Sequence, residues 1–350
     1  MLTEAAARAA LTSVPYPGLE RDIVALGLVR SVTIRDDCVH VSLVLSTERD
    51  DVPDLLRSTI RERLKEAGAV RSEVQILPPG QAPGRRNPWA GRTRLPNVGR
   101  IVAVGAGKGG VGKSTVAVNL ALALRARGVR VGLLDADIYG PSVPMLVGLE
   151  DGAKRVRMSD RKQVIPLEAL GLAVVSFGFF LGPESPAVWR GPLVGKAVKQ
   201  FSRGVLWPEL DVVVVDLPPG TGDVPLSLAQ AVVVDGAVVV TTPQRLAATE
   251  AAKAVAMFRK LDVPVLGVVE NMAFAECACG RRSHPFGRGG GETLAREVGI
   301  DLLGSVPFGE ETVEGGDTGV PAVLRDPGSG PARVFTEIAD GIAGRLTRVP

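Results

Sequence analysis

The sequence predicts an α/β protein with a doubly wound, mostly parallel sheet, preceded by a small α+β domain. Two patterns carry this prediction. Beyond residue 100, short and wholly apolar segments alternate with helical ones, as they do when parallel strands are buried on both faces. Before residue 79, helices and strands are mixed, and the strands alternate apolar with polar residues. The length of 350 residues fits this division, because a domain takes roughly 150 residues.

Composition and charge exclude several classes of protein. Hydrophobic residues make up 45% and charged residues 23%, the balance of an ordinary globular protein. The 41 basic residues nearly match the 38 acidic ones, so we expect no general coat for nucleic acid or anionic membranes. Three cysteines do not make a secreted disulfide scaffold. No apolar run approaches the roughly 20 residues of a membrane span, and the start at Met1–Glu4 is not a signal peptide. We therefore expect a cytoplasmic protein with no membrane and no nucleic-acid partner.

Residues 1–78 form the predicted small domain. The helix over Asp54–Glu66 repeats apolar residues at helical spacing and stops before Gly68. Cys38 stands at the start of a strand and is most simply a packed thiol. The elements expected here are helices over Thr3–Leu11, Glu20–Leu26 and Asp54–Glu66, and strands over Val29–Arg35, Val39–Leu45 and Val74–Leu77.

A linker is predicted over residues 79–98. The composition changes abruptly there to proline and arginine, and the stretch contains no acidic residue. This composition is typical of an exposed connection between domains. The basic run could contact an acidic partner, but a solvated tether is the simpler interpretation.

The large domain is predicted over residues 99–350. In doubly wound sheets, ligands bind beyond the carboxyl ends of the strands. The last helix, Arg333–Leu346, has one apolar face and few basic residues, so we expect it to pack on the sheet and not on a membrane. The expected strands are Ile101–Val104, Val131–Leu134, Val212–Val215, Ala237–Val240 and Val265–Val269, with helices between them that include Lys113–Arg127 and Arg245–Leu261.

The strongest signal in the chain is a phosphate-binding loop, Gly107–Ser114. It fits the P-loop pattern, and it lies between an apolar strand and a helix, as that motif requires. Its glycines let backbone N–H groups converge on phosphate oxygens, and the helix N-terminus adds a partial positive charge. We expect Lys113 to reach the β- and γ-phosphates and the Ser114 hydroxyl to coordinate Mg²⁺. The expected nucleotide-binding residues are Gly107, Lys108, Gly109, Gly110, Val111, Gly112, Lys113, Ser114 and Thr115.

Three carboxylates at strand ends belong to the same chemistry. Asp135 and Asp137 follow one apolar strand, and Asp216 follows another. A single Asp at such a place is often only a turn cap, but three of them beside a P-loop favour a metal–phosphate role. Asp216 is the expected acid of the Mg²⁺ shell. The loop Leu217–Asp223, rich in proline and glycine, is placed to sense a γ-phosphate.

These segments resemble the deviant Walker A ATPases, a family of dimeric P-loop ATPases that includes MinD, ParA, the nitrogenase iron protein and the Mrp/ApbC proteins. The extra lysine Lys108 carries the resemblance to the whole family. The similarity covers about residues 99–325, and residues 1–78 resemble a small domain that many bacterial members carry. Segments similar to the Mrp/ApbC branch of iron–sulfur cluster carriers are Asp135–Ser142, Trp189–Pro192, Asp216–Asp223, Thr241–Gln244 and Glu270–Met272.

The resemblance implies a slow ATPase that holds an iron–sulfur cluster at the interface of a homodimer and transfers it to apo-proteins. Lys108 would reach across the interface to phosphates bound by the other subunit. Asp137 would position or activate the attacking water beside Lys113, and Asn271 would contact the adenine. The implied cofactors are ATP, Mg²⁺ and the cluster. The implied partners are a second copy of the chain, apo iron–sulfur proteins and cluster assembly factors.

Cys277 and Cys279 are the candidate cluster ligands. Thiolates are soft ligands for iron, and the neighbouring Arg281 and Arg282 favour the ionised form. Two chains together supply four thiolates, as a bridging [4Fe–4S] cluster requires. Carriers of the family usually have two residues between the cysteines, and this chain has one, so two ordinary loop residues remain an alternative. His284 is a further candidate ligand, although a polar loop histidine is the commoner case.

Three functions remain open at this stage. The first is the ATP-dependent cluster carrier. The second is an ATP-driven positioning protein of the MinD/ParA type, which binds a membrane or DNA and no cluster. The third is a nucleotide switch that assembles other proteins. Iron content separates the first from the other two, whereas loss of Lys113 affects all three alike.

Overall fold

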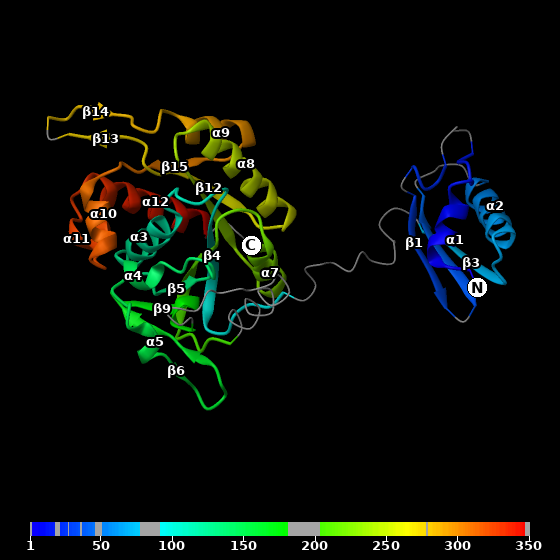
Figure 1. Cartoon of the computed structure of the whole chain (residues 1–350), viewed down its shortest axis with the longest axis horizontal. Coiled ribbons are helices and arrows are strands. Elements are labelled where there is room, and N and C mark those ends of the chain that lie inside the picture. The colour runs from blue at the N-terminus through cyan, green and yellow to red at the C-terminus, as the bar shows by residue number, and fades with distance from the viewer. Residues whose placement is uncertain are drawn as a thin grey trace. The chain divides into compact units, whose positions relative to one another are not determined.

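The computed structural model describes residues 2–17, 22–26, 28–35, 37–45, 51–77, 92–180, 204–277 and 279–346. The chain divides into two compact units, Met1–Ala90 and Gly91–Pro350, and each is described by itself (Figure 1). In the part that the structure describes, no helix has both the length and the apolar character needed to cross a bilayer.

The small unit is a three-stranded sheet covered by two helices. The sheet has the order β1-β2-β3, with β1 (Val29–Arg35) antiparallel and β3 (Arg71–Leu77) parallel to β2 (Cys38–Val44). The helices α1 (Glu4–Leu11) and α2 (Val52–Glu66) supply much of its apolar core. The largest fully buried side chains of this core are Leu11, Ile23, Leu43, Leu56, Ile60 and Leu64.

The expected helix over Glu20–Leu26 is wrong for the residues that are described. Residues 23–26 form a turn, and Asp22 makes an isolated antiparallel β-bridge with Pro15. The Asp22 carboxylate accepts hydrogen bonds from the backbone N–H groups of Val24, at 2.9 Å, and Ala25, at 2.7 Å. An Asp side chain that bonds the backbone in this way competes with helix formation and favours a turn.

The large unit is built on an eight-stranded sheet, which confirms the predicted doubly wound α/β fold. The strand order is β15-β12-β11-β4-β10-β5-β9-β8, and each neighbouring pair is parallel except β8 and β9. The strands are β4 (Val98–Ala106), β5 (Val131–Asp135), β8 (Leu167–Ala169), β9 (Leu172–Ser176), β10 (Leu210–Asp216), β11 (Gly236–Thr241), β12 (Val265–Glu270) and β15 (Leu302–Ser305).

Helices and short hairpins complete the large unit (Figure 1). The helices are α3 (Lys113–Arg125), α4 (Val143–Leu146), α5 (Gly152–Arg155), η1 (Phe177–Phe180), α7 (Asp223–Ala231), α8 (Arg245–Lys260), α9 (Gly290–Val298), α10 (Glu310–Asp317), α11 (Ala322–Arg325) and α12 (Gly330–Leu346). The hairpins pair β6 (Arg157–Met158) with β7 (Val164–Ile165), and β13 (Ala275–Glu276) with β14 (Arg282–Ser283). The apolar face of α12 packs against α3 and β15, as expected for the last helix.

Residues 92–98, which the sequence assigns to the linker, lie against the large unit. The Arg92 guanidinium donates hydrogen bonds to the backbone carbonyls of Ala229, at 2.6 Å, and Leu261. Arg94 forms an ion pair with Asp235, whose side chain is 1% exposed. A buried carboxylate requires such partners, and this explains why the end of the stretch is anchored and not solvated. Residues 79–91 lie outside the described residues.

Candidate functional site

The predicted phosphate site lies where three central strands end. β10 pairs with β4 on one side and β5 on the other, and Asp216 is in register with Val104 and Asp135. Because parallel strands end at one edge of the sheet, this topology gathers the P-loop after β4 and the acids after β5 and β10.

The P-loop is held so closely that two of its glycines cannot be replaced without movement. A Cβ at Gly107 would lie 2.1 Å from the backbone carbonyl of Glu250 in α8. Gly112 has a φ of +77°, and a Cβ there would lie 2.2 Å from Nδ2 of Asn271. The Asn271 amide in turn donates a 2.9 Å hydrogen bond to the carbonyl of Val111. The loop is therefore fixed between α8 and the end of β12.

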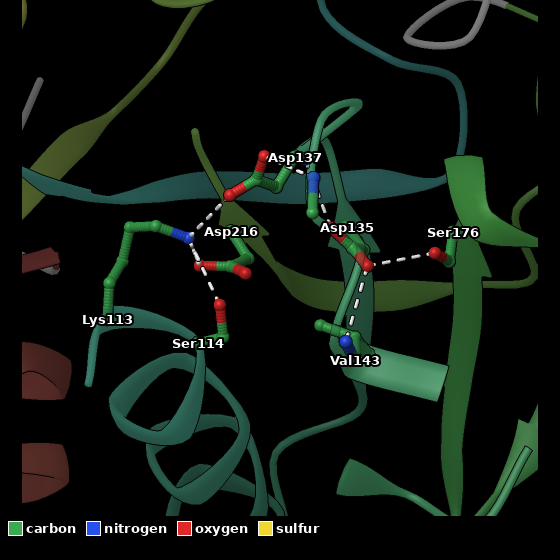
Figure 2. Close-up of polar contacts among 8 residues, drawn as sticks. Lys113, Ser114, Asp135, Asp137, Val143, Ser176 and Asp216 are labelled. Carbon is green, nitrogen blue, oxygen red and sulfur yellow. Dashed lines mark hydrogen bonds and ion pairs between the residues drawn. The ribbon is translucent and has the colours of Figure 1, made fainter. Parts of the chain in front are cut away.

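The side chain of Lys113 points toward Asp137 and Asp216, two of the three acidic residues (Figure 2). Its buried ammonium donates to Asp216 Oδ1 at 2.6 Å and to the Ser114 hydroxyl at 3.1 Å. Asp137 Oδ2 lies 3.6 Å from the same Nζ. The structure therefore brings three other predicted site residues together around the Lys113 ammonium.

Asp216 has the character of a metal ligand. Burial raises the pKa of this carboxyl, and the neighbouring Lys113 lowers it. Its Oδ2 is buried and has no hydrogen-bond partner among the described residues. In that part of the chain no three His, Cys, Asp or Glu side chains form a metal site of their own. This arrangement fits Mg²⁺, which is typically held by one or two protein oxygens together with phosphates and water. The oxygens available here are those of Asp216 and Ser114.

Asp135 fills a different position from the other two acids. Its Oδ1 accepts a hydrogen bond from the N–H of Asp137 at 3.0 Å, and its Oδ2 accepts from the N–H of Val143 at 3.3 Å and from the Ser176 hydroxyl at 2.8 Å. Burial, with the nearby Asp216 as a second cause, raises the pKa of Asp135 to about 8. The side chain is thus engaged in holding the following loop, and its expected metal–phosphate role stays a prediction.

Ser176 is the functional candidate that the sequence did not reveal. It ends β9, where no strand was expected, and no P-loop motif includes it. The one local signal is the polar residue that closes the apolar run Leu172–Val175. By contrast, the Trp189–Pro192 segment, which was singled out by resemblance, lies outside the described residues.

Two pockets flank the Lys113 cluster. One, of about 500 Å³, lies between the Asp137–Gly140 loop and residues 218–224. The other, of about 240 Å³, is lined by Gly112, Thr115, Asn271 and Phe308 among others. The first borders the acid expected to position water, and the second borders the residue expected to contact adenine. A wider groove of about 1000 Å³ opens at the other end of the strands, around Trp207 and Arg130, and none of the predicted site residues lines it.

Lys108 is half-exposed and has no hydrogen-bond or ion-pair partner among the described residues. Its side chain lies in the P-loop but does not join the cluster around Lys113. The expected contact of Lys108 with the phosphates of a second subunit stays a prediction.

Cys277 and Cys279 lie on the exposed hairpin formed by β13 and β14 (Figure 1). Their sulfurs are joined as a disulfide, with the two Cα atoms 5.3 Å apart. A tight turn produces this approach, since the N–H of Gly280 donates to the carbonyl of Cys277 at 2.8 Å. One intervening residue, Ala278, which lies outside the described residues, is thus enough to bring both sulfurs together.

Two side chains near the cysteine pair, Arg282 and His284, make contacts that stabilise the hairpin. Arg282 forms an ion pair with Glu276 at 2.8 Å, and its guanidinium stacks 4.2 Å from the centre of the Phe274 ring. His284 Nδ1 lies 3.1 Å from the carbonyl of Ala273. His284 therefore stabilises the base of the hairpin through this contact.

Each of the two units matches the model of a known protein family. A family model described as NUBPL iron-transfer P-loop NTPase matches residues 97–343. A second model, described as iron–sulfur cluster assembly protein, matches residues 4–76. These ranges cover the large and the small unit in turn.

Relatives named iron–sulfur cluster carrier protein align along most of the chain. The protein from Pseudomonas fragi is 52% identical over 246 residues, which cover 70% of this chain and 85% of the relative. The protein from Synechocystis is 40% identical over 350 residues and 99% of both chains. The protein from Escherichia coli K12 is 40% identical over 338 residues, covering 96% of this chain and 90% of the relative.

Two solved structures resemble the large unit. A nucleotide-binding protein from Archaeoglobus fulgidus, in complex with ADP, superimposes with a TM-score of 0.60 at 40% identity, covering 69% of this chain and 94% of that one. The cell division ATPase MinD of Pyrococcus furiosus has a TM-score of 0.52 at 24% identity, covering 71% and 99%. The second likeness concerns the fold alone.

Proposed function

The chain belongs to the NUBPL-type family of iron-transfer P-loop NTPases, and from this premise we propose that it is an ATP-hydrolysing carrier of iron–sulfur clusters. One observation carries the proposal. The nucleotide site and the cysteine pair occupy consecutive segments, because β12 ends beside Asn271 and the hairpin that holds Cys277 and Cys279 follows directly. A conformational change at one site thus reaches the other through a very short stretch of backbone.

The P-loop and Lys113 bind the phosphates in this proposal. The backbone N–H groups of the loop and the start of α3 favour anionic oxygens. Lys113 turns from Asp216 toward the phosphates when nucleotide enters, since it is the buried cation of the site. Ser114 and Asp216 hold Mg²⁺, which supplies charge neutralisation for the β- and γ-phosphates.

Asp137 holds the attacking water. The N–H of Gly140 donates to Asp137 Oδ1 at 3.2 Å, and this contact leaves the other oxygen facing Lys113 and the site. Asn271 and Thr115 line the pocket assigned to the base, and Lys108 reaches the phosphates of a second subunit. In the proposed function, ATP hydrolysis requires the homodimer, because Lys108 does not contact the Lys113 cluster of its own subunit.

The cluster is the cargo, and its ligands are the reduced thiolates of Cys277 and Cys279. The disulfide must first take up two electrons and two protons, which a thiol reductant supplies. Two chains then present four thiolates for a [4Fe–4S] cargo, and apo iron–sulfur proteins receive it. The small unit, which matches the cluster assembly family, is the candidate site for recruiting assembly factors.

The test is anaerobic reconstitution with iron and sulfide under a thiol reductant, followed by iron analysis and visible absorption. We expect about two irons per chain, as four thiolates on two chains hold one [4Fe–4S] cluster. The double variant C277A/C279A should lose the iron and keep ATPase activity. Cys38→Ala is the matched control, because Cys38 lies in the small unit, and it should keep both.

Two outcomes would contradict the proposal in different ways. An unmutated chain that hydrolyses ATP but binds no iron is a nucleotide switch without a cluster. A chain that binds iron equally well in the double variant holds the cluster elsewhere. Lys113→Ala, which removes the cation of the phosphate site, should abolish nucleotide binding and leave iron binding intact.

A further inference from the structure

Ser176 is a fully buried hydroxyl at the end of β9 that connects two structural elements. Its Oγ donates a 2.8 Å hydrogen bond to Asp135 Oδ2 and accepts one from the N–H of Gly178 at 2.9 Å. The second bond fixes the direction of the first, because the hydroxyl proton is left free to point at the carboxylate. A polar side chain buried to this degree is expected to be fully hydrogen-bonded. Here one bond is local, from the start of η1 (Phe177–Phe180), and the other leads to Asp135 and the loop that follows it.

That loop, residues 137–143, carries Asp137, and Asp135 fastens it at both ends. The N–H of Asp137 donates to Asp135 Oδ1, and the N–H of Val143 donates to Asp135 Oδ2 (Figure 2). The orientation of the Asp135 carboxylate therefore sets where the backbone of Asp137 lies. Since Ser176 bonds the same Oδ2 that accepts from Val143, it fixes that orientation from the neighbouring strand.

A second contact joins the same two elements. A Cβ at Gly178 would lie 3.1 Å from Cβ of Pro141, closer than ordinary van der Waals contact. The start of η1 therefore packs against the middle of the loop, while Ser176 holds its ends through Asp135. The loop is supported at two places by β9 and the residues after it.

We propose that Ser176 is a positioning residue for ATP hydrolysis, which orients Asp135 so that the loop 137–143 presents Asp137 to the attacking water. This inference rests on the proposed ATPase activity. Ser176 touches no phosphate-binding group, and neither of its hydrogen bonds reaches the P-loop or Asn271. It acts on the chemical step and leaves nucleotide binding to the rest of the site.

Ser176→Ala in the full chain tests the proposal by steady-state ATPase kinetics and by nucleotide-binding stoichiometry. We expect kcat to fall about tenfold, the effect of a slightly misplaced catalytic group, with KM for ATP within about twofold of the parent. The stoichiometry of ADP binding should stay at that of the parent, because a merely unfolded fraction would lower it together with kcat.

The matched control is Ser329→Ala. Ser329 is also buried, and its hydroxyl donates to the carbonyl of Asp326 and accepts from the N–H of Ala332 at the start of α12. Its removal costs a similar pair of hydrogen bonds away from Asp135, so kcat should stay within about twofold of the parent. Gly178→Ala is a second probe, since it pushes on Pro141 and should also lower kcat without raising KM.

Three results would overturn the proposal. The first is a folded Ser176→Ala variant with the kcat of the parent. The second is a Ser176→Ala variant in which kcat and the number of ADP-binding sites fall by the same factor. If Ser176→Ala does not fold, an unchanged kcat in Gly178→Ala overturns the proposal instead. The third is an unmutated chain that hydrolyses no ATP, which refutes the proposed function itself and is seen before any variant is made.

Discussion

Asp235 joins residues 94–101, where the chain enters the large unit, to the amino end of the central strand β11. Its removal should destabilise that unit. The side chain is 1% exposed, and its oxygens accept from the N–H of Ile101 at 2.8 Å, from Arg94 at 3.0 Å and from Arg100 at 2.9 Å. In Asp235→Ala the buried N–H of Ile101 is left without a partner, and two arginines lose their carboxylate.

The magnitude follows from these three contacts. An unsatisfied buried N–H costs about 1–3 kcal/mol. Each arginine pair adds about 0–1 kcal/mol, because Arg94 is 50% and Arg100 is 29% exposed and solvent screens both. The total is about 3 kcal/mol, which lowers the Tm of a unit of this size by roughly 6–12 °C. Asp235→Asn keeps an acceptor for the N–H and should lose about half as much.

Differential scanning calorimetry of the full chain measures this effect. Added ADP identifies the transition of the large unit, since a bound ligand raises its Tm. Asp340→Ala is the matched control, because Asp340 also pairs with an arginine, Arg127, but is 57% exposed. That control should shift Tm by no more than about 4 °C. An Asp235→Ala shift as small as the control's would show that the buried carboxylate is not what anchors residues 92–101.

Three further predictions concern the nucleotide site. Gly112→Ala places a Cβ 2.2 Å from Asn271 Nδ2, at a residue whose φ is +77°. The affinity for a fluorescent ATP analogue should therefore fall at least about tenfold. An unchanged affinity would contradict the tight packing described for the loop. Lys108→Ala should bind that analogue within about twofold of the parent but lose most ATP hydrolysis, measured by phosphate release, because in the proposed function this lysine acts on the phosphates of another subunit. Full activity would argue against a shared site. Asp135→Asn tests the pKa of about 8, raised from 3.8. The folded parent keeps a proton that the unfolded chain releases, so its urea stability should decline as pH rises from about 4 to 8. The stability of the variant should decline less steeply, because the contribution of Asp135 is gone and that of Asp216 remains, and parallel curves would refute the prediction.

The sequence was most informative where a short stretch of chain determines the structure by itself. The P-loop and the strand before it could be predicted because the glycine pattern and the apolar run are local, and the structure places Lys113, Ser114 and Asp216 together as expected. Asp22 shows the limit of local patterns. Its side chain turns the backbone where the apolar spacing alone favoured a helix.

Contacts between distant segments could not be predicted in this way. Ser176 lies 41 positions from Asp135 in the chain, and their hydrogen bond exists only because β9 pairs with β5. Arg94 meets Asp235 across 141 positions, and this distance is why an arginine-rich stretch without acids resembled a free tether. In both cases the missing information is the order of the strands, which no motif in the chain encodes.

The position of the cysteine hairpin beside the nucleotide site has a mechanical consequence. Before the hairpin, Asn271 donates to the P-loop carbonyl of Val111, and after it, the N–H of Gly291 at the start of α9 donates to the Glu270 carboxylate at 2.7 Å. His284 closes the base by contacting the carbonyl of Ala273. Both ends of the hairpin are therefore attached to the last residues of β12. If a bound nucleotide displaces that strand end, the displacement reaches the hairpin and its two cysteines through both attachments.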